Sequence, residues 1–286
     1  MSTNEESRKR SIDQLEKEED PQKLDPLGDL KIDDDQVLKD IRQRSACPSC
    51  KRSVKYFCYK CYQVVGMDRS KLPHVHLPIH LDVIKHHKEL DGKSTAIHAK
   101  IISDDKDVDI HTYCPPDRIP QFEEPEKALL LFPGPSAKQL KDIPSLDSFN
   151  RVVVIDGTWH QAKQIAHNTP ILNKMQKVTI APRKTTFWRF QNVDDQHLAT
   201  IEAIYYFYRE YFEACQQQQH QTKYDGRFDN LLFYYKFFYN LIQRTYQTNK
   251  TAKFSHRHQQ KDYIKNREDK SEEKEEDITD SSRNGK

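Results

Sequence analysis

The sequence predicts an α/β domain built around a largely parallel sheet. Short aliphatic runs alternate with amphipathic segments from residue 72 onward, and this alternation is typical of parallel sheets covered by helices. The clearest run, residues 151–155, is short, continuous and rich in β-branched side chains, as a buried parallel strand is. It leads directly into Asp156, and a helix is expected to begin at Thr158 or Trp159. Because ligands bind at the carboxyl ends of strands in such sheets, this stretch is a candidate site.

Charge is unevenly distributed along the 286 residues. Residues 1–40 hold 7 basic and 13 acidic side chains, residues 267–286 hold 5 and 8, and the remaining residues hold 34 and 23. Both ends are poor in aromatic residues, so residues 1–44 and 251–286 are predicted to be charged, disordered tails. The basic central part suits a polyanionic partner such as RNA, although basic character alone is a weak indication.

Several classes of protein are excluded by what the sequence lacks. No apolar run approaches about 18 residues and the first ten residues contain no apolar stretch, so neither a membrane span nor a secretory signal peptide is expected. No glycine-rich nucleotide-binding fingerprint follows a strand, and no zinc-protease or serine-hydrolase motif is found. Six cysteines without a secretion signal indicate a reducing compartment, with thiols as metal ligands or buried residues.

Residues 45–70 are predicted to form a zinc knuckle. Two C-x-x-C pairs are separated by seven residues, and the "SVKYF" stretch between them can form a short strand. Four thiolates complete a tetrahedral site without an open position, which is a structural rather than a catalytic arrangement. Iron binding or a redox pair is the alternative, but the ligand set favours zinc. The proposed ligands are Cys47, Cys50, Cys58 and Cys61, whereas Cys114 and Cys215 are expected to be buried free thiols.

Further strands are expected along the chain. Residues 79–83 alternate between apolar and polar side chains as a strand does, and residues 96–102 fit either a strand or a short helix. Residues 128–132 form a buried strand that a Pro-Gly pair ends, with Ser136 expected to cap a short helix. "KVTIAPR" indicates another strand, which ends at Pro182.

Two aromatic helices complete the predicted domain. The first follows Asp194 or Asp195 as its N-cap, and the second covers residues 229–246. Their aromatic stripes are interpreted as packing surface rather than base-stacking platforms. The stripe of the first helix consists of Leu198, Ile201, Tyr205, Tyr208, Phe212 and Cys215.

Four loops are expected to meet on one rim of the sheet. They contain "FPGPSA", "DGTWHQA", "APRKTTFWRF" and "LATIEA", and each follows a strand or begins a helix. The residues themselves therefore predict a ligand site on this rim, beside basic and aromatic side chains.

These motifs together resemble the DTW-domain family, and most closely its eukaryotic tRNA-uridine aminocarboxypropyltransferases. The resemblance rests on Asp156-Gly157-Thr158-Trp159 with "LLLFPG" upstream and "LATIEA" downstream, and it covers roughly residues 47–246. Two positions depart from the usual pattern of the family. Ala199 stands where a serine is usual, and Phe190 and Gln191 follow Arg189 where a second arginine is common.

The resemblance implies a SPOUT-like α/β fold with a knotted carboxyl half, in which residues 71–250 form the catalytic DTW domain. It also implies an S-adenosylmethionine-dependent transferase that moves the 3-amino-3-carboxypropyl group to N3 of a uridine in the tRNA D-loop and releases methylthioadenosine. The expected partner is tRNA, with neither DNA nor a membrane. The expected location is the nucleus, with the cytoplasm as an additional one, and the expected state is a monomer or a weak homodimer.

Site residues follow from the same resemblance. The catalytic set is Asp156, Thr158 and Trp159; the co-substrate set is Pro133, Gly134, Leu198, Thr200, Glu202 and Ala203; the RNA-binding set is Lys163, Arg183, Lys184 and Arg189. Asp156 is interpreted as a general base or as a group that orients the uracil imide, and the alternative is a helix cap. Trp159 is expected to stack on a base or on the sulfonium group, or else to be a core tryptophan. Glu202 is expected to pair with the α-ammonium group, or simply to favour the helix dipole.

Some features leave more than one interpretation open. "DGKSTAIHAK" belongs to the shared pattern, but the sequence does not explain the roles of Lys93, Ser94, Thr95 and His98; a structural role is expected for His98. A methyltransferase of the same broad fold would use the same co-substrate. A non-catalytic zinc-ribbon adaptor that binds RNA is the alternative from a different functional class.

Overall fold

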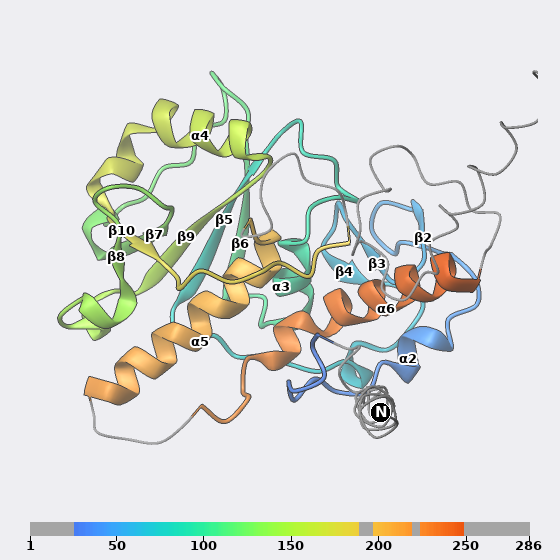
Figure 1. Ribbon diagram of the computed structural model, residues 1–286. Coiled ribbons are helices and arrows are strands. Elements are labelled where there is room, and N and C mark those ends of the chain that lie inside the picture. Colours follow the sequence, from blue (N-terminus) through green and yellow to red (C-terminus); the bar gives the residue numbers. More distant parts are fainter. Residues whose placement is uncertain (1–25, 189–196, 219–223, 249–286) are drawn as a thin grey trace, which may run out of the picture.

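The computed structural model describes residues 26–188, 197–218 and 224–248, and its centre is a six-stranded sheet (Figure 1). The strand order is β6-β5-β9-β7-β10-β8, and every neighbouring pair is parallel. The strands are β5 His80–His86, β6 Val108–Tyr113, β7 Ala128–Leu131, β8 Lys138–Gln139, β9 Arg151–Asp156 and β10 Gln176–Thr179. The predicted α/β class with a mostly parallel sheet is confirmed.

Helices cover both faces of the sheet because its central strands are apolar on both sides. In β9, Val152 and Val154 belong to one core cluster, whereas Val153 belongs to a second cluster on the other face. The first cluster includes side chains of α3 (Ile97–Ile102), α5 (Thr200–Gln218) and α6 (Phe233–Thr248). The second includes Ile165 of α4 (Trp159–Asn168). This two-sided burial explains the continuous aliphatic runs of the sequence.

Residues 97–102 form the helix α3, so the helix alternative for this segment is confirmed. Other elements differ from their predictions. β6 was not predicted, because it lies at the sheet edge and its central side chains are partly exposed, which leaves little apolar signal. Ser136 caps no helix: the chain there forms a turn, the two-residue β8 and a short 3₁₀ turn.

Short 3₁₀ helices connect many of the elements. They are η2 Arg69–Lys71, η3 Pro125–Lys127, η4 Leu140–Asp142, η5 Leu146–Ser148, η6 Pro170–Lys174 and η7 Asp229–Leu232.

The two aromatic helices are present, with shifted beginnings. α5 begins at Thr200, so the predicted caps Asp194 and Asp195, which lie outside the described residues, do not start it. The predicted last helix begins as the 3₁₀ turn η7 and continues as α6. The interpretation of the aromatic stripe as packing surface is confirmed, because Tyr205 and Tyr208 are fully buried.

The cysteine-rich segment folds into two small hairpins beside α6 (Figure 1). β1 (Ser45–Ala46) pairs with β2 (Ser53–Val54), and β3 (Phe57–Cys58) pairs with β4 (Gln63–Val64), both antiparallel. Phe57 packs edge-on against Tyr234 of α6, with 4.9 Å between the ring centroids. The knuckle therefore shares a core with the main domain.

The predicted disordered tail of residues 1–44 is too long, because the folded part of the chain already includes residues 26–44. From residue 26 onward the chain packs on the domain: Leu27 and Leu38 are buried, the latter in α2 (Gln36–Lys39). The Lys31 backbone N–H donates to the buried Asp229 carboxylate at 2.7 Å. A few apolar side chains within an acidic segment are enough for this docking, and average composition conceals them. The remainder of that tail and all of the predicted carboxyl-terminal tail lie outside the described residues. Within the described ranges, no helix is long and apolar enough to cross a membrane.

Candidate active site at the carboxyl ends of the strands

A cavity of about 350 Å³ lies where β7, β9 and β10 end, a volume within the usual range for small-molecule sites. All four rim loops contribute to its lining, as the sequence predicts. They supply, in chain order, Phe132 and Pro133; Gly157 and Trp159; Ala181, Pro182 and Arg183; and Leu198, Thr200 and Ala203. The wall is mainly apolar, with a small number of polar groups, as in most pockets that bind cofactors or substrates.

The first turn of α4 is organised by a capping box. Thr158 is the N-cap: its Oγ1 accepts from the Gln161 backbone N–H at 3.3 Å, and the Gln161 side chain accepts from the Thr158 backbone N–H at 2.8 Å. A Cβ on Gly157 would lie only 2.8 Å from Gln161 Oε1, so a larger residue here would displace the Gln161 side chain from the capping box. The alternative that Asp156 caps the helix is therefore wrong. The T-x-x-Q spacing in the sequence could have identified Thr158 instead.

Trp159 forms part of the cavity wall. It is half-buried, and its ring lies 6.2 Å from Phe132 and 4.9 Å from His197, the latter contact edge-on. An indole that lines a cavity and is only half-buried is available to a ligand, in contrast to a core tryptophan.

Asp156 lies behind the cavity wall rather than in it. The side chain is buried, with 2% exposure, and it is not part of the lining. Ser94 Oγ donates to one carboxylate oxygen and Thr200 Oγ1 donates to the other, each at 2.6 Å. Burial raises the pKa of Asp156, while the two hydroxyl hydrogen bonds and the Lys85 charge oppose that shift. The carboxylate thus reaches the cavity only through the hydroxyl of Thr200.

The shared "DGKST" motif has a structural explanation. Besides the bond from Ser94 to Asp156, Thr95 Oγ1 accepts from the Ile201 backbone N–H at 3.1 Å. These contacts join the loop before α3 to the end of β9 and to the first turn of α5. Lys93 of the same motif is exposed, whereas His98 is buried among Phe57 and other rings of the knuckle interface, away from the cavity.

Glu202 organises the polypeptide around the start of α5. It is buried, and its oxygens accept from the Ala199 N–H at 2.7 Å, from Thr185 Oγ1 at 2.6 Å, and from the N–H and Oγ1 of Thr186, both at 2.9 Å. The carboxylate is thus fully engaged by the protein and is not part of the cavity lining.

The basic residues of the predicted RNA-binding set occupy different surroundings. Arg183 lines the cavity, pairs with Glu210 and lies over the Tyr206 ring at 4.2 Å. Lys163 and Lys184 are exposed and do not line the cavity, and Arg189 lies outside the described residues. Among the predicted co-substrate residues, Pro133, Leu198, Thr200 and Ala203 line the cavity, whereas Gly134 does not.

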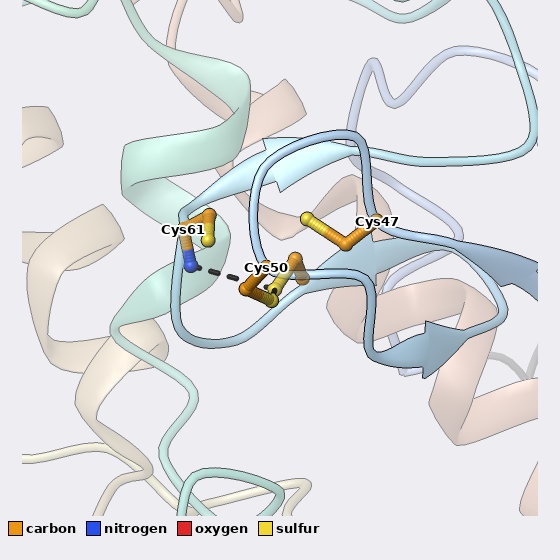
Figure 2. A group of neighbouring side chains, drawn as sticks. Cys47, Cys50 and Cys61 are labelled. Carbon is orange, nitrogen blue, oxygen red and sulfur yellow. Dashed lines mark hydrogen bonds between the residues drawn. The ribbon is translucent and has the colours of Figure 1, made fainter.

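The four predicted zinc ligands converge in the knuckle, and Figure 2 labels Cys47, Cys50 and Cys61. Their sulfur atoms all lie within 4.8 Å of one another, with Cys50 and Cys58 at 3.5 Å. A tetrahedral zinc–sulfur site places its sulfurs about 3.8 Å apart, so the donor set and spacing fit zinc. The Arg52 backbone N–H lowers the pKa of Cys50 to about 7, which favours a thiolate, whereas burial raises the pKa of Cys61 to about 12. A bound dication would deprotonate the latter thiol as well.

Sequence reasoning missed some residues of the cavity. His197 directly precedes the "LATIEA" motif, and Ile180 follows β10. A histidine or an isoleucine in a loop carries no distinctive spacing. The only signal was position, because both residues flank motifs that were already assigned to the rim.

Comparison with known proteins reveals related sequences over most of the chain. The DTW domain matches residues 55–243. tRNA-uridine aminocarboxypropyltransferase 1 of Mus musculus is 36% identical over 276 residues, covering 80% of this chain and 88% of the mouse protein. The Homo sapiens protein of that name is 35% identical, covering 77% and 84%, and the Xenopus tropicalis protein is 33% identical, covering 76% and 86%. No solved structure matches.

Proposed function

The chain belongs to the DTW-domain family, and from this membership and the cavity we propose that it is a tRNA-uridine aminocarboxypropyltransferase. The enzyme transfers the 3-amino-3-carboxypropyl group of S-adenosylmethionine to N3 of a uridine in the D-loop of tRNA. The observation that carries this proposal is the cavity at the carboxyl ends of β7, β9 and β10, with an indole in its wall and a carboxylate-bound hydroxyl beside it.

The cavity is the proposed site of S-adenosylmethionine. Its apolar wall suits an adenine ring, and a sulfonium cation over the face of Trp159 gains about 0.5–2 kcal/mol. Pro133, Leu198, Thr200 and Ala203 surround the co-substrate, and Gly134 extends this rim. We assign Glu202 an indirect part, because its oxygens already accept four hydrogen bonds from the protein and hold the start of α5 in place.

Asp156 is proposed to act on the uridine through Thr200 rather than by direct contact. Thr200 donates its single hydroxyl proton to Asp156, so toward the cavity its oxygen can only accept. In the proposed step, uridine N3 attacks the carbon of the aminocarboxypropyl group that is bonded to sulfur. The bond between this carbon and sulfur breaks, and its electron pair goes to sulfur. The N3 proton passes to Thr200 Oγ1, whose own proton passes to Asp156. Thr158 holds α4, and thereby Trp159, in position.

A tRNA partner is supported by charge as well as by the family. Residues 41–67 contain six basic side chains and no acidic one, and Arg42, Arg52 and Lys60 of this segment are exposed. Together with the exposed Lys163 and Lys184, they provide phosphate contacts. Arg183 contacts either a phosphate or the co-substrate carboxylate from the cavity wall. Arg189, outside the described residues, is assigned to the same set.

The remaining assignments concern organisation and location. We propose a zinc-containing knuckle at residues 45–70, a catalytic domain at residues 71–250 and a SPOUT-like fold with a knotted carboxyl half. The all-parallel sheet, in which β9 lies between the earlier strands β5 and β7, supports that fold. An experimental structure in which the chain traces without a knot would contradict it.

We also propose that the protein is a monomer or a weak homodimer and that it is located in the nucleus. Its import is assisted by "SRKR" near the amino terminus, which a fluorescent fusion lacking these four residues would test.

The function is tested with purified protein, undermodified tRNA and S-adenosylmethionine labelled separately in the carboxypropyl and methyl carbons. Carboxypropyl label in the tRNA, with release of methylthioadenosine, is expected. Methyl label in the tRNA would instead identify a methyltransferase. Binding of tRNA without transfer of either label would support an RNA-binding adaptor.

A further inference from the structure

A second group of side chains with metal-binding atoms lies at the amino ends of the strands, opposite the cavity. It involves residues of the segments that precede β5 and β6, near the amino ends of these strands. We propose that this group binds one divalent transition-metal ion, with zinc as the preferred metal. Its ligands are His74, His76, Asp104 and Asp107.

The backbone brings three of these side chains to one surface. Val75 forms a parallel bridge with Ser103, and both of these side chains are buried. Successive side chains of extended segments point to opposite sides, so the flanking His74, His76 and Asp104 face outward together. The H-x-H spacing therefore presents two imidazoles on the side that carries a carboxylate from the neighbouring segment.

The fourth side chain is held in place by two backbone contacts. The Asp107 N–H donates to the Asp104 carbonyl at 2.9 Å, which closes a turn between the two acidic residues. The Leu77 N–H donates to Asp107 Oδ2 at 3.0 Å. Asp107 is consequently buried and fixed, with 7% exposure, rather than free in solvent.

The distances between ligand atoms suit a small dication. His76 Nδ1 lies 2.9 Å from Asp107 Oδ2 and 3.4 Å from Asp104 Oδ2, and His74 Nε2 lies 2.9 Å from Asp104 Oδ1. Nitrogen and oxygen ligands about 2.0–2.2 Å from a tetrahedral zinc ion are about 3.3–3.5 Å from each other. The ligand atoms of His76, Asp104 and Asp107 all lie within 4.8 Å of one another, whereas His74 contacts Asp104 alone and joins the proposed site by rotation of its side chain.

Charge balance distinguishes this group from an ordinary cluster of ion pairs. Within the described part of the chain, neither Asp104 nor Asp107 forms an ion pair with a lysine or arginine; their partners are imidazoles. Two carboxylates and two neutral imidazoles form a site of charge −2, which a divalent ion neutralises.

The neighbouring group around Asp82 provides the contrast. His80 and Asp109 lie beside this buried carboxylate, but Arg151 pairs with it at 3.1 Å and His111 at 2.7 Å. A permanent cation already compensates that carboxylate. The inference is therefore confined to the His74 group, where it predicts a metal that holds the segment before β5 to the turn before β6.

The test counts zinc in the purified, tag-free full chain after dialysis against metal-free buffer and addition of Zn²⁺. Wild-type protein is expected to hold about two zinc ions, one in the knuckle and one in the proposed site. The double variant His74→Ala/His76→Ala and the variant Asp107→Asn should each hold about one. Asparagine retains an acceptor for the Leu77 N–H while removing the anionic ligand, so the turn itself is preserved.

Controls separate this site from the knuckle and from non-specific binding. His167→Ala removes an exposed histidine of α4 and should retain both ions. With Co²⁺ as probe, the thiolate charge-transfer absorption of the knuckle should be the same in wild type and in the double variant, which shows that the knuckle is intact. Added Zn²⁺ should raise Tm in wild type more than in the double variant. A single zinc ion in wild type, or equal zinc content in wild type and the double variant, would overturn the proposal, and neither result depends on enzymatic activity.

Discussion

At the scale of single residues, Asp156 and Thr200 form the polar centre of the candidate active site. Two segments 44 residues apart contribute them, and a third contributes Ser94. The carboxylate is buried and does not line the cavity, whereas Thr200 lines the cavity and its hydroxyl contacts the carboxylate. Proton transfer to Asp156 must therefore pass through Thr200. The shape and the hydroxyl of this side chain can be changed separately by substitution.

Replacing Thr200 tests this arrangement directly. Thr200→Val retains the branched shape but removes the hydroxyl, and it should lower kcat by about 10²–10³-fold, since proton transfer in the transition state is lost. Thr200→Ser retains the hydroxyl and should remain within about tenfold of wild type. Single-turnover transfer to tRNA measures both variants, with equilibrium binding of S-adenosylmethionine as the control. Equal rates for the valine and serine variants would show that the hydroxyl is not used.

The pH dependence of turnover should report Asp156. The carboxylate accepts a proton only when ionised, and burial raises its pKa, so kcat should fall with decreasing pH at a higher pH than for an ordinary aspartate. Ser94→Ala removes a hydrogen bond that lowers this pKa, so the acid limb should move to still higher pH. Asp156→Asn should leave a slow residual reaction without that limb. An unmoved limb in Ser94→Ala would assign it to another group.

At the scale of elements, the knuckle and α6 stabilise each other. Phe57 lies against Tyr234 and Phe238, and Tyr56 lies 5.1 Å from Phe237, so loss of the metal would disturb the aromatic face of α6. Each strand of these hairpins is only two residues long, so the hairpins are too short to be stable without a bound metal.

Replacing Cys47 and Cys50 with serine should therefore remove one zinc ion per chain and lower Tm. Metal analysis and thermal unfolding measure the two effects. Cys114→Ser and Cys215→Ser form the matched controls, because neither belongs to the cluster, and both should retain the thiolate absorption with Co²⁺. A cysteine pair variant with full zinc content would exclude this ligand set.

At the scale of the whole molecule, the segment before the knuckle belongs to the fold. Leu38 is fully buried although it lies in an acidic stretch, and it packs in the same core cluster as the sheet and α5. Leu38→Ala should lower the free energy of unfolding by about 2–5 kcal/mol through loss of burial and creation of a cavity. Urea unfolding measures this change. Leu90, with 60% exposure, is the matched control, and its replacement by alanine should have little effect. A similar result for both variants would mean that residues 26–44 dock only weakly.

The sequence by itself determined the features that depend on neighbouring residues. Alternation of apolar side chains identified β5, continuous burial identified β7 and β9, and the paired C-x-x-C spacing identified the knuckle ligands. The four loop motifs predicted the rim of the sheet at which the cavity lies. These features are encoded within a few residues, because strand periodicity, helix periodicity and metal-ligand spacing are local properties of the chain.

Only the tertiary structure decided what the polar residues of the rim do. Ser94 and Asp156 are 62 residues apart, and whether their side chains meet depends on how the loop before α3 packs over β9. The same holds for Glu202, which serves the protein's own threonines, and for Asp156, which lies behind Thr200 instead of facing the ligand. A hydrogen bond requires placement within a few tenths of an ångström. That placement comes from the packing of the whole core, which no local pattern specifies.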